Sequence, residues 1–598
     1  MSSVIMQPSV DVVVVGLGQM GGVIAAELST AGFKVVGIDK GPYLNYVVDF
    51  AETQKFDEWK TQFTHFFDHK LSMWTYSLRT EPTQFAVPVR RYTKNVSNVP
   101  EGHEIGGMGV HFGGGLGRYM PWTYGAYSST VSRYGASFLS NIEANIDLED
   151  YPVTYDDLVP YYQSWEKAIG VSGQDQEPFI PNSAYPNPPH PTTPLGTMYQ
   201  STVEAMGYSP NASVSAIASK PYMNQYGIAR NACVYDGWCA SGSCNMVCET
   251  GAKGSSHVST IPAAIATGNF TMVTNSVVFR INLNSAGTAA TGVSYYDQRG
   301  NINVQPATVV FIGMWSLPSI RMLLLSGVGT PYNYANQTGV TGRGIVPPPN
   351  TSSSTSSGTI TTIGGNAYPA GNASGGGYNT LDFAGDNFDH TGMNFIGGTS
   401  QGAGGYLGGG PNNLTLVAPG LTNFGSAYKA GLKNVKLPTT VSVSAGGAGI
   451  ILPTSDHFAD LDPHYVDMFG DPIMRISMNF DNNALNASDY LAVACAPILT
   501  KLGATNIKTT KTAHTSVAPN DRWSAHQRGG ARMGANSQTS VFNQWLQSWN
   551  VDNLFSAGEH VIMLGDNVTA GTHGIAPMSY LSAEGIKMYL KSPGPLVI

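Results

Sequence analysis

The chain has 598 residues, which is long enough for a large buried core and too long for one ordinary domain, so we expect two closely joined domains. Only 12% of the residues are charged, and 39 acidic residues against 31 basic ones give a net charge of −8. This composition excludes the cationic surface that nucleic-acid binding requires. The chain contains no run of about 18 apolar residues, so we expect no segment to span a bilayer.

The predicted elements begin with a β-α-β unit. Apolar runs predict strands at residues 11–16 and 34–39, and apolar residues at helical spacing predict a helix at residues 20–31 between them. In such a unit the turn between the first strand and the helix lies at the carboxyl edge of a parallel sheet, which is where nucleotides bind.

Three glycines and one acidic residue of this unit match a dinucleotide-binding turn. Gly16, Gly18 and Gly21 follow the first strand, and Asp39 ends the second strand about 20 residues later. The first glycine permits the tight turn, the second lets the backbone approach a pyrophosphate at the helix N-terminus, and the third allows close packing of the helix. Asp39 is then the predicted acceptor for the ribose hydroxyl groups.

A second glycine-rich segment, residues 106–117, surrounds His111. Its glycine content is too high for the interior of a helix, so the backbone must pass close to something flat or charged. The glycines that we assign to this contact are Gly106, Gly107, Gly113 and Gly114.

Further along, helical and extended patterns alternate. Thr154 is predicted to start a helix that continues to residue 169, because acidic residues follow it in the first turn. The proline-rich residues 178–195 predict an extended connection. Strands are predicted at residues 277–282, 289–296 and 308–313, and a helix at residues 318–326. Residues 347–410, rich in Gly, Ser, Thr and Asn, are predicted to be an ordered insertion because aromatic residues interrupt them; the alternative is a mobile linker.

The C-terminal region carries two histidines, His526 and His573. His526 begins the sequence His-Gln-Arg-Gly-Gly-Ala-Arg-Met-Gly, and residues 553–559 are Asn-Leu-Phe-Ser-Ala-Gly-Glu. Together with the glycine segments, these stretches resemble the glucose-methanol-choline (GMC) oxidoreductases, in the branch of the gluconate, fructose and glucose dehydrogenase large subunits and the pyranose oxidases. Gly530 stands where the family motif has Thr. Further segments that resemble the family are residues 152–173, 313–326 and 386–390, so the likeness covers most of the chain.

The resemblance implies FAD as the cofactor and a mixed α/β (α+β) fold, with a Rossmann-like FAD-binding domain and a substrate-binding domain built on an antiparallel sheet. It implies that residues 1–130, 231–335 and 515–598 form the FAD-binding domain, and that residues 131–230 and 336–514 form the substrate-binding domain. His111 would lie beside the flavin ring, either covalently bonded to FAD or packed near the isoalloxazine. The other implied cofactor contacts are Val278, Gly558 and Glu559.

Oxidation of an alcohol by hydride transfer requires a base for the hydroxyl proton. Imidazole titrates near neutral pH, so it can take that proton when it lies within hydrogen-bond reach of the oxygen. His526 is the predicted base. His573, at the place of the family's second catalytic residue, is predicted to hold the same oxygen and to aim the carbinol hydrogen at flavin N5, because small misplacements cost much rate. The alternative for either histidine is an ordinary surface or capping residue.

Four of the five cysteines, Cys233, Cys239, Cys244 and Cys248, lie in one short stretch. Thiolates in this number suit an iron-sulfur or zinc site, and an iron cluster would carry single electrons away from a flavin. Resemblance to the FAD-dependent glucose and fructose dehydrogenases implies a three-iron, four-sulfur cluster held by Cys239, Cys244 and Cys248, a pattern that Cys233 fits less well. Disulfides and zinc are the alternatives. Cys495, in an apolar run, is predicted to be a buried small hydrophobic residue.

The predicted reaction is therefore the oxidation of a sugar or polyol alcohol, with electrons passed through a cluster to a cytochrome or another acceptor. The alternatives are an oxygen-using sugar oxidase without a cluster and a flavin electron-transfer subunit without its own alcohol substrate. Residues 1–10 lack the basic segment, apolar run and cleavage site of a signal peptide. By analogy with the dehydrogenase complexes, we expect a small subunit with an export signal and a cytochrome c subunit as partners. The expected location is the periplasm, or the membrane through a partner, with the cytoplasm as the alternative.

Overall fold

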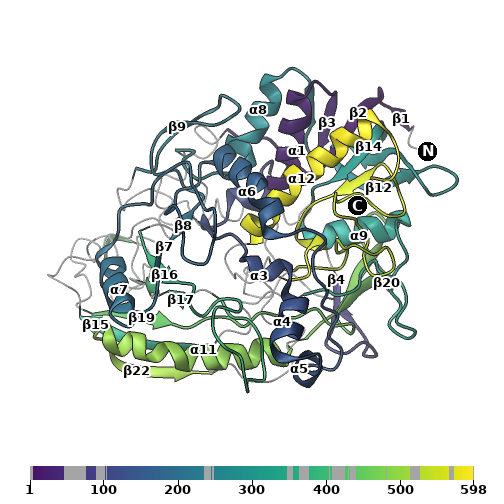
Figure 1. The fold of residues 1–598 in the computed structure, drawn as a ribbon. Helices are drawn as coiled ribbons and strands as arrows, with labels where there is room; N and C mark the ends of the chain where they lie inside the picture. Colours follow the sequence, from purple (N-terminus) through teal and green to yellow (C-terminus); the bar gives the residue numbers. More distant parts are fainter. Residues whose placement is uncertain are drawn as a thin grey trace.

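The computed structural model describes residues 4–45, 76–88, 102, 104–234, 244, 248, 250–346, 354–361, 376–399, 401–402, 404–406, 425–427, 430, 440–479, 481–511, 526–564 and 571–596. Figure 1 shows a mixed α/β structure, with β2, β3 and β14 beside α1, α8 and α12 at one end of the molecule, and with α11 and its strands at the other.

An eight-stranded sheet forms the first of these regions. Parallel pairing joins its strands in the order β11, β3, β2, β14 and β23. Their bounds are Phe270–Val273 for β11, Val35–Ile38 for β3, Val10–Val15 for β2, Ile302–Ile312 for β14 and Leu554–Ser556 for β23. Val12, Val13 and Val14 have no exposed surface, which is typical of a parallel sheet that is covered on both faces.

The long strand β14 joins two parts of this sheet. Its residues 307–312 pair in parallel with β2, and its residues 302–306 pair antiparallel with β13 (Ala290–Tyr296). β13 pairs in turn with β12 (Val277–Leu283), and β1 (Ile5–Met6) pairs with β14. Because β2, β3, β14 and β23 are parallel, the loops that follow them meet at one edge.

Among the described helices, α1 (Gln19–Thr30), α8 (Thr260–Ala266), α9 (Ser316–Ser326) and α12 (Gly571–Lys591) contact strands of this sheet, and α6 (Tyr155–Ile169) packs on α12. α1 contacts α8 and α12, and α12 contacts α6. Thr154 caps α6: its hydroxyl accepts the N–H of Asp157, whose carboxylate accepts the N–H of Thr154. α6 ends at Gly170, which has a left-handed φ of +82°. The helix therefore has a fixed start and end, and its buried face meets α12.

The second region is built on smaller sheets. One antiparallel sheet has the order β18 (Gly404–Tyr406), β19 (Thr440–Ala445), β15 (Thr355–Thr361) and β22 (Thr505–Thr510), and α11 (Asn482–Lys501) packs on it. Another sheet has the order β20 (Phe458–Val466), β21 (Pro472–Ser477), β4 (Tyr76–Arg79) and β5 (Val87–Pro88). The expected mixed α/β fold with an antiparallel sheet is confirmed.

The remaining described elements are shorter connections. They are η2 (Gly107–Val110), β6 (Gly115–Leu116), α3 (Pro121–Tyr124), α4 (Ala126–Tyr134), α5 (Ser137–Ile142), α7 (Pro194–Glu204), β7 (Pro210–Ala212), β8 (Val214–Ser215), β9 (Tyr222–Met223), β10 (Ala229–Arg230), η3 (Ser256–Val258), α9 (Ser316–Ser326), β16 (Tyr378–Thr380), β17 (Gln401–Gly402) and η7 (Glu559–Val561).

The elements predicted from the sequence are confirmed, with shifts at their ends. β14 begins well before the predicted residue 308, because antiparallel pairing with β13 extends it into a less apolar stretch. The extended connection from residue 178 ends where α7 begins, at Pro194. Within residues 347–410, the described parts include β15, β16, β17 and β18, which supports an ordered insertion there.

No helix within the described ranges is both long and apolar enough to cross a membrane. The predicted domain ranges stay a prediction. β4, from residues 1–130, pairs with β21, from residues 336–514, so these two ranges contribute to one sheet.

Candidate active site

The turn between β2 and α1 has the shape that its glycines predict. Gly16 has a left-handed φ of +88°. A side chain at Gly21 would collide with the carbonyl oxygen of Gly16, whereas no atom of the described residues lies within 4 Å of a Cβ placed at Gly18. α1 begins with no side-chain cap and no acidic residue in its first turn. The positive end of this helix therefore faces a space that fits a pyrophosphate.

Asp39 follows β3 and joins two backbone turns through hydrogen bonds. Its carboxylate accepts hydrogen bonds from the N–H groups of Leu17 at 2.7 Å and Gly41 at 2.9 Å. Burial raises the pKa of this carboxyl, and the two N–H groups oppose that rise. The N–H of Ser276 donates to the carbonyl of Asp39 at 2.9 Å, which brings the start of β12 and the buried Val278 to the same corner. Each carboxylate oxygen can accept a second hydrogen bond, so Asp39 retains acceptor capacity for ribose hydroxyls.

The second glycine segment, residues 106–117, lies against this turn. The N–H of Gly106 donates to the carbonyl of Leu17 at 3.0 Å. A Cβ at Gly107 would lie 3.7 Å from the Cα of Gly18. The segment continues through Gly113 and Gly114 into β6. The structure therefore brings the two glycine segments together, and they fit one dinucleotide.

His111 lies at the end of η2 and is buried. Its Nε2 is 2.6 Å from Oε1 of Glu104, so a carboxylate fixes one side of the ring. Its position within the second glycine segment agrees with a place near a bound cofactor, while covalent attachment of FAD stays a prediction.

The two C-terminal motifs lie side by side. Backbone hydrogen bonds of 2.8–3.0 Å join residues 529–533 to residues 559–561. β23, which lies within the second motif (residues 553–559), pairs with the carboxyl end of β14. A Cβ at Gly558 would lie 3.3 Å from the carbonyl oxygen of Met314, in the loop after β14. Both motifs are thus at the edge where the nucleotide turn lies.

His526 lies where these motifs meet the start of α12. Its Nδ1 is 3.7 Å from Oε1 of Glu559, and 35% of its side chain is exposed. A Cβ at Gly571, the first residue of α12, would overlap this Glu559 oxygen and lie 3.4 Å from Nδ1 of His526. His526 is therefore an accessible imidazole with a carboxylate neighbour. Residues 512–525 and 565–570 lie outside the described ranges.

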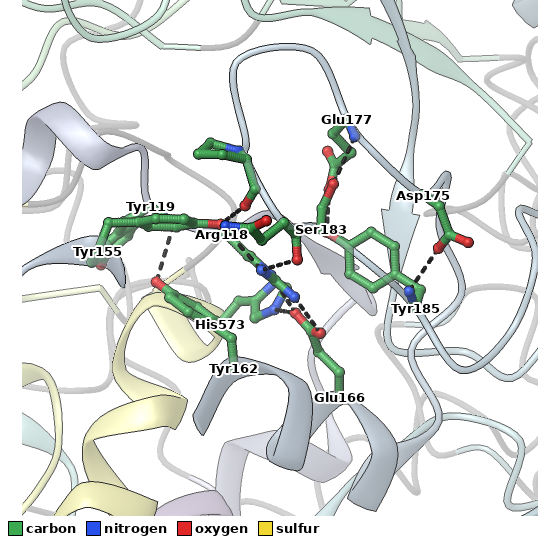
Figure 2. A network of polar contacts seen from close by, with 12 residues as sticks. Arg118, Tyr119, Tyr155, Tyr162, Glu166, Asp175, Glu177, Ser183, Tyr185 and His573 are labelled. Carbon is green, nitrogen blue, oxygen red and sulfur yellow. Dashed lines mark hydrogen bonds and ion pairs between the residues drawn. The ribbon is translucent and has the colours of Figure 1, made fainter. Parts of the chain in front are cut away.

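His573, two residues further into α12, is fully buried in a polar network (Figure 2). Its Nε2 lies 2.8 Å from Oε1 of Glu166 in α6. Nε and Nη2 of Arg118 donate to the same carboxylate at 2.7 Å each. The rings of Tyr162 and Trp165 contact the imidazole, with centroid separations of 5.4 Å. The first turn of α12 therefore contains Gly571, which lies next to His526, and His573, whose ring faces Glu166 of α6.

The charges of this network determine its protonation. Burial acts to raise the pKa of Glu166, but the hydrogen bonds from His573 and Arg118 and the charge of Arg118 hold it below its ordinary value. Burial lowers the pKa of His573, which favours its neutral form. A neutral His573 that donates its Nε2–H to Glu166 presents Nδ1 as an acceptor, and Nδ1 has no partner among the described residues.

Sequence reasoning missed Arg118 and Glu166. Glu166 lies on the apolar face of α6, one turn after Tyr162. A charged residue on the buried face of an amphipathic helix could have indicated it, because carboxylates are rarely buried without a partner. Arg118 directly follows the second glycine segment, and no pattern in the sequence distinguishes it.

Cys233, Cys244 and Cys248 lie within the described residues, and Cys239 lies outside them. The Sγ of Cys248 is 3.4 Å from the hydroxyl oxygen of Thr250. Among the described residues no group of three or more side chains is placed to hold a metal ion. The cluster and its alternatives involving Cys239 stay predictions. Cys495 is confirmed as fully buried.

Comparisons with known proteins identify the family. Two models described as GMC oxidoreductase match residues 151–366 and 453–563. The gluconate 2-dehydrogenase flavoprotein of Pantoea cypripedii is 31% identical, over 98% of this chain and 95% of that protein. The chain belongs to the GMC oxidoreductase family. As a GMC oxidoreductase it acts on CH–OH donors and uses FAD, which the paired glycine segments fit.

More distant GMC relatives agree over the full length. The fructose dehydrogenase large subunit of Gluconobacter japonicus is 23% identical, over 98% of each chain. A solved structure of the formate oxidase of Aspergillus oryzae superposes with a TM-score of 0.58 at 12% identity and covers 99% of both chains. At that identity the second likeness shows the fold alone.

Two glycine substitutions should separate cofactor binding from folding. Gly18→Ala adds a methyl group where the protein leaves space, so we expect the apoprotein to keep its free energy of unfolding and to lose FAD affinity. Gly21→Ala adds one against the carbonyl of Gly16, so both quantities should fall. Urea unfolding of the apoproteins and FAD titration measure them. Equal FAD affinity in wild type and Gly18→Ala would contradict the assignment of the turn.

Glu177, shown near Arg118 in Figure 2, is a second buried carboxyl of this region. It accepts hydrogen bonds from the hydroxyl of Tyr185 and the amide of Asn211. Burial raises the pKa of Glu177 to about 7 from an ordinary value of 4.5, although both hydrogen bonds act to lower it.

This pKa predicts how stability depends on pH. Between about pH 4.5 and about 7 the unfolded carboxyl ionises before the folded one, so the wild type loses stability as the pH rises. Glu177→Gln has no proton to lose, so the wild type should lose on the order of 3 kcal/mol relative to this variant across that window. Urea unfolding at several pH values measures the difference, with the exposed Glu204→Gln as control. A difference that does not change with pH would contradict the assignment.

Proposed function

We propose that this GMC oxidoreductase oxidises an alcohol group of a sugar or polyol, with hydride transfer to N5 of the flavin. The observation that carries the proposal is the position of His526, an accessible imidazole beside Glu559 at the carboxyl end of the nucleotide-binding sheet. The substrate class is supported by relatives named gluconate 2-dehydrogenase flavoprotein and fructose dehydrogenase large subunit. When bound, FAD supplies the acceptor for the carbinol hydrogen and its two electrons.

His526 takes the hydroxyl proton in this proposal. Its exposed surface lets a substrate oxygen reach the ring, and Nδ1 lies beside the carboxylate of Glu559 at 3.7 Å. Glu559 is thus the carboxylate that faces the imidazole when the proton arrives. Because Nδ1 faces Glu559, Nε2 is the nitrogen that serves the substrate.

His573 holds the substrate oxygen through Nδ1. Glu166 accepts its Nε2–H, and Arg118 holds Glu166 with two hydrogen bonds, so the ring has one orientation. A second fixed contact restricts the alcohol to geometries in which the carbinol hydrogen faces the flavin. This role requires the oxygen to reach a side chain that is fully buried, so His526 is the stronger of the two assignments.

We propose that Cys239, Cys244 and Cys248 would hold an iron-sulfur cluster, which would supply a route for single electrons away from the flavin. Cys244 and Cys248 lie within the described residues, and the hydroxyl oxygen of Thr250 and the backbone nitrogen of Lys253 each lie 3.4 Å from the Sγ of Cys248. The words flavoprotein and large subunit in the relatives' names support partner subunits. We propose a small subunit that carries an export signal and a cytochrome c subunit, with the complex working in the periplasm at the membrane.

Substitution of the base should slow the reaction without loss of the cofactor. His526→Asn should lower the rate of flavin reduction by a sugar substrate about 10²- to 10⁴-fold, because the hydroxyl proton then has no acceptor. FAD content and the unfolding temperature should stay at wild-type values. The exposed His464→Asn is the matched control. Wild-type rates in His526→Asn, measured by anaerobic stopped flow, would refute its role as the base.

The cluster is tested on enzyme purified without air. Iron, acid-labile sulfide and an electron paramagnetic resonance signal of a three-iron cluster should accompany the flavin. Cys248→Ser should lose the iron and keep the FAD, whereas Cys495→Ala, at the buried cysteine outside this stretch, should keep both. Flavin without iron in the wild type would contradict the export route and make oxygen consumption with sugars the next assay.

A further inference from the structure

Lys253 is a buried lysine that contacts two functional segments at once. It is 3% exposed. Its Nζ donates to the carbonyl of Val110 at 2.8 Å, to the carbonyl of Phe112 at 2.9 Å and to the carbonyl of Cys244. An ammonium group has three N–H donors, and burying it is costly unless acceptors replace water. These acceptors therefore give Lys253 a specific position.

On one side, Lys253 holds the second glycine segment. Val110 and Phe112 flank His111, the residue expected beside the flavin, so Nζ binds the carbonyl on each side of that histidine. The charge also lies 5.5 Å from the centre of the Phe112 ring, close enough for a cation–π contact. Lys253 therefore restrains the backbone on both sides of His111.

On the other side, Lys253 holds two cysteines. Its side chain binds the carbonyl of Cys244, and its backbone N–H lies 3.4 Å from the Sγ of Cys248. A hydrogen bond from a backbone N–H stabilises a thiolate and restrains where the sulfur lies. The same residue thus restrains one cysteine through its side chain and the other through its main chain.

The backbone of Lys253 is itself anchored. Ala218 donates to the carbonyl of Ala252 at 3.0 Å, and Gly254 donates to the carbonyl of Ala216 at 2.7 Å. Ala216 also donates to the carbonyl of Gly114 at 2.7 Å, which gives the second glycine segment an attachment that does not depend on the lysine side chain. Removal of the ammonium should therefore release Cys244 more than the glycine segment.

We propose that Lys253 is a positioning residue that holds Cys244 and Cys248 against the second glycine segment and so sets the rate at which electrons leave the reduced flavin. This inference rests on the proposed electron export. The substrate loses a hydride and a proton; the two electrons of that hydride pass singly to two molecules of a one-electron acceptor such as a c-type cytochrome, and the proton of the hydride and the hydroxyl proton are released to solvent. Lys253 takes no electron or proton in these steps.

The positional part of the proposal is tested by thiol labelling of the anaerobic holoenzyme. Lys253→Met keeps the apolar stem and removes the three donors. A maleimide should label Cys244 at least about tenfold faster in Lys253→Met than in wild type, because local opening exposes it, whereas the labelling of Cys248, which the backbone N–H of residue 253 still contacts, should change less. Lys220→Met, at an exposed lysine, should leave the labelling rate unchanged. Equal labelling in all three proteins would overturn the proposal.

A kinetic split distinguishes this role from a general structural one. In Lys253→Met, electron delivery to the cytochrome should slow at least about tenfold more than flavin reduction by substrate does, because the glycine segment keeps its attachment through Ala216. A parallel loss of both rates would show a merely structural residue and refute the proposal. Labelling does not depend on turnover. If the enzyme oxidises no sugar but Lys253→Met is still labelled faster than wild type, the proposed function fails while the position of Lys253 is supported.

The wild-type protein offers a test in case Lys253→Met does not fold. Amine acetylation of the native holoenzyme, read by mass spectrometry, should modify Lys220 and leave Lys253 unmodified. The conservative Lys253→Arg should then label at Cys244 more slowly than Lys253→Gln, because its guanidinium retains charge and donors. Acetylation of Lys253 at the rate of Lys220, or equal labelling of the two variants, would overturn the proposal.

Discussion

Parallel pairing of β14 with β2 on one side and β23 on the other determines where the candidate functional residues lie. Parallel strands end at the same edge, so the loop after β2 and the loop after β23 must meet although they are more than 500 residues apart in the sequence. The first loop supplies the glycine turn and the second supplies Gly558 and Glu559. Without this pairing, residues 526–534 and 553–559 would not lie at the edge that carries the glycine turn.

A second constraint is the buried charge of α6. Glu166 and Arg118 are both fully withdrawn from water, so each requires the other, and removal of one partner would leave an uncompensated charge. The same carboxylate binds His573 and selects the tautomer of its ring. The capping box at Thr154 and the left-handed Gly170 fix α6 at both ends, which fixes where this carboxylate stands against α12. The position of α6 therefore determines the position of the Glu166–Arg118 ion pair, and this pair determines the orientation of the His573 ring.

Much of the fold could be predicted from the sequence because its signals are local. The apolar run of β2, the glycine spacing after it and the acidic first turn after Thr154 each specify one element. The candidate site was harder to predict than the fold because the residues that contact one another there are far apart in the sequence. His526 was predicted from its motif as a site residue. Its proximity to Gly571, however, depends on how α12 packs against that motif. Arg118 could not be found at all, since its partners come from another helix and the patterns around it are those of an ordinary loop.

Lys253 illustrates the same limit. Its position five residues after Cys248 is visible in the sequence, but its contacts with Val110 and Phe112 depend on a bridge between Lys253 and Ile217 that no local pattern predicts. Charged residues that are buried by tertiary contacts have no periodic or compositional mark, so sequence reasoning finds them only when they fall on an otherwise apolar face.

The measurement that tests the central claim most directly is anaerobic flavin reduction by a panel of aldoses, ketoses, aldonates and polyols, followed by the loss of flavin absorbance. The account predicts that at least one member of the panel reduces the flavin, and that deuterium at its carbinol carbon slows this reduction several-fold. A flavin that dithionite reduces but that no sugar or polyol reduces would contradict the claim that this chain oxidises such alcohols.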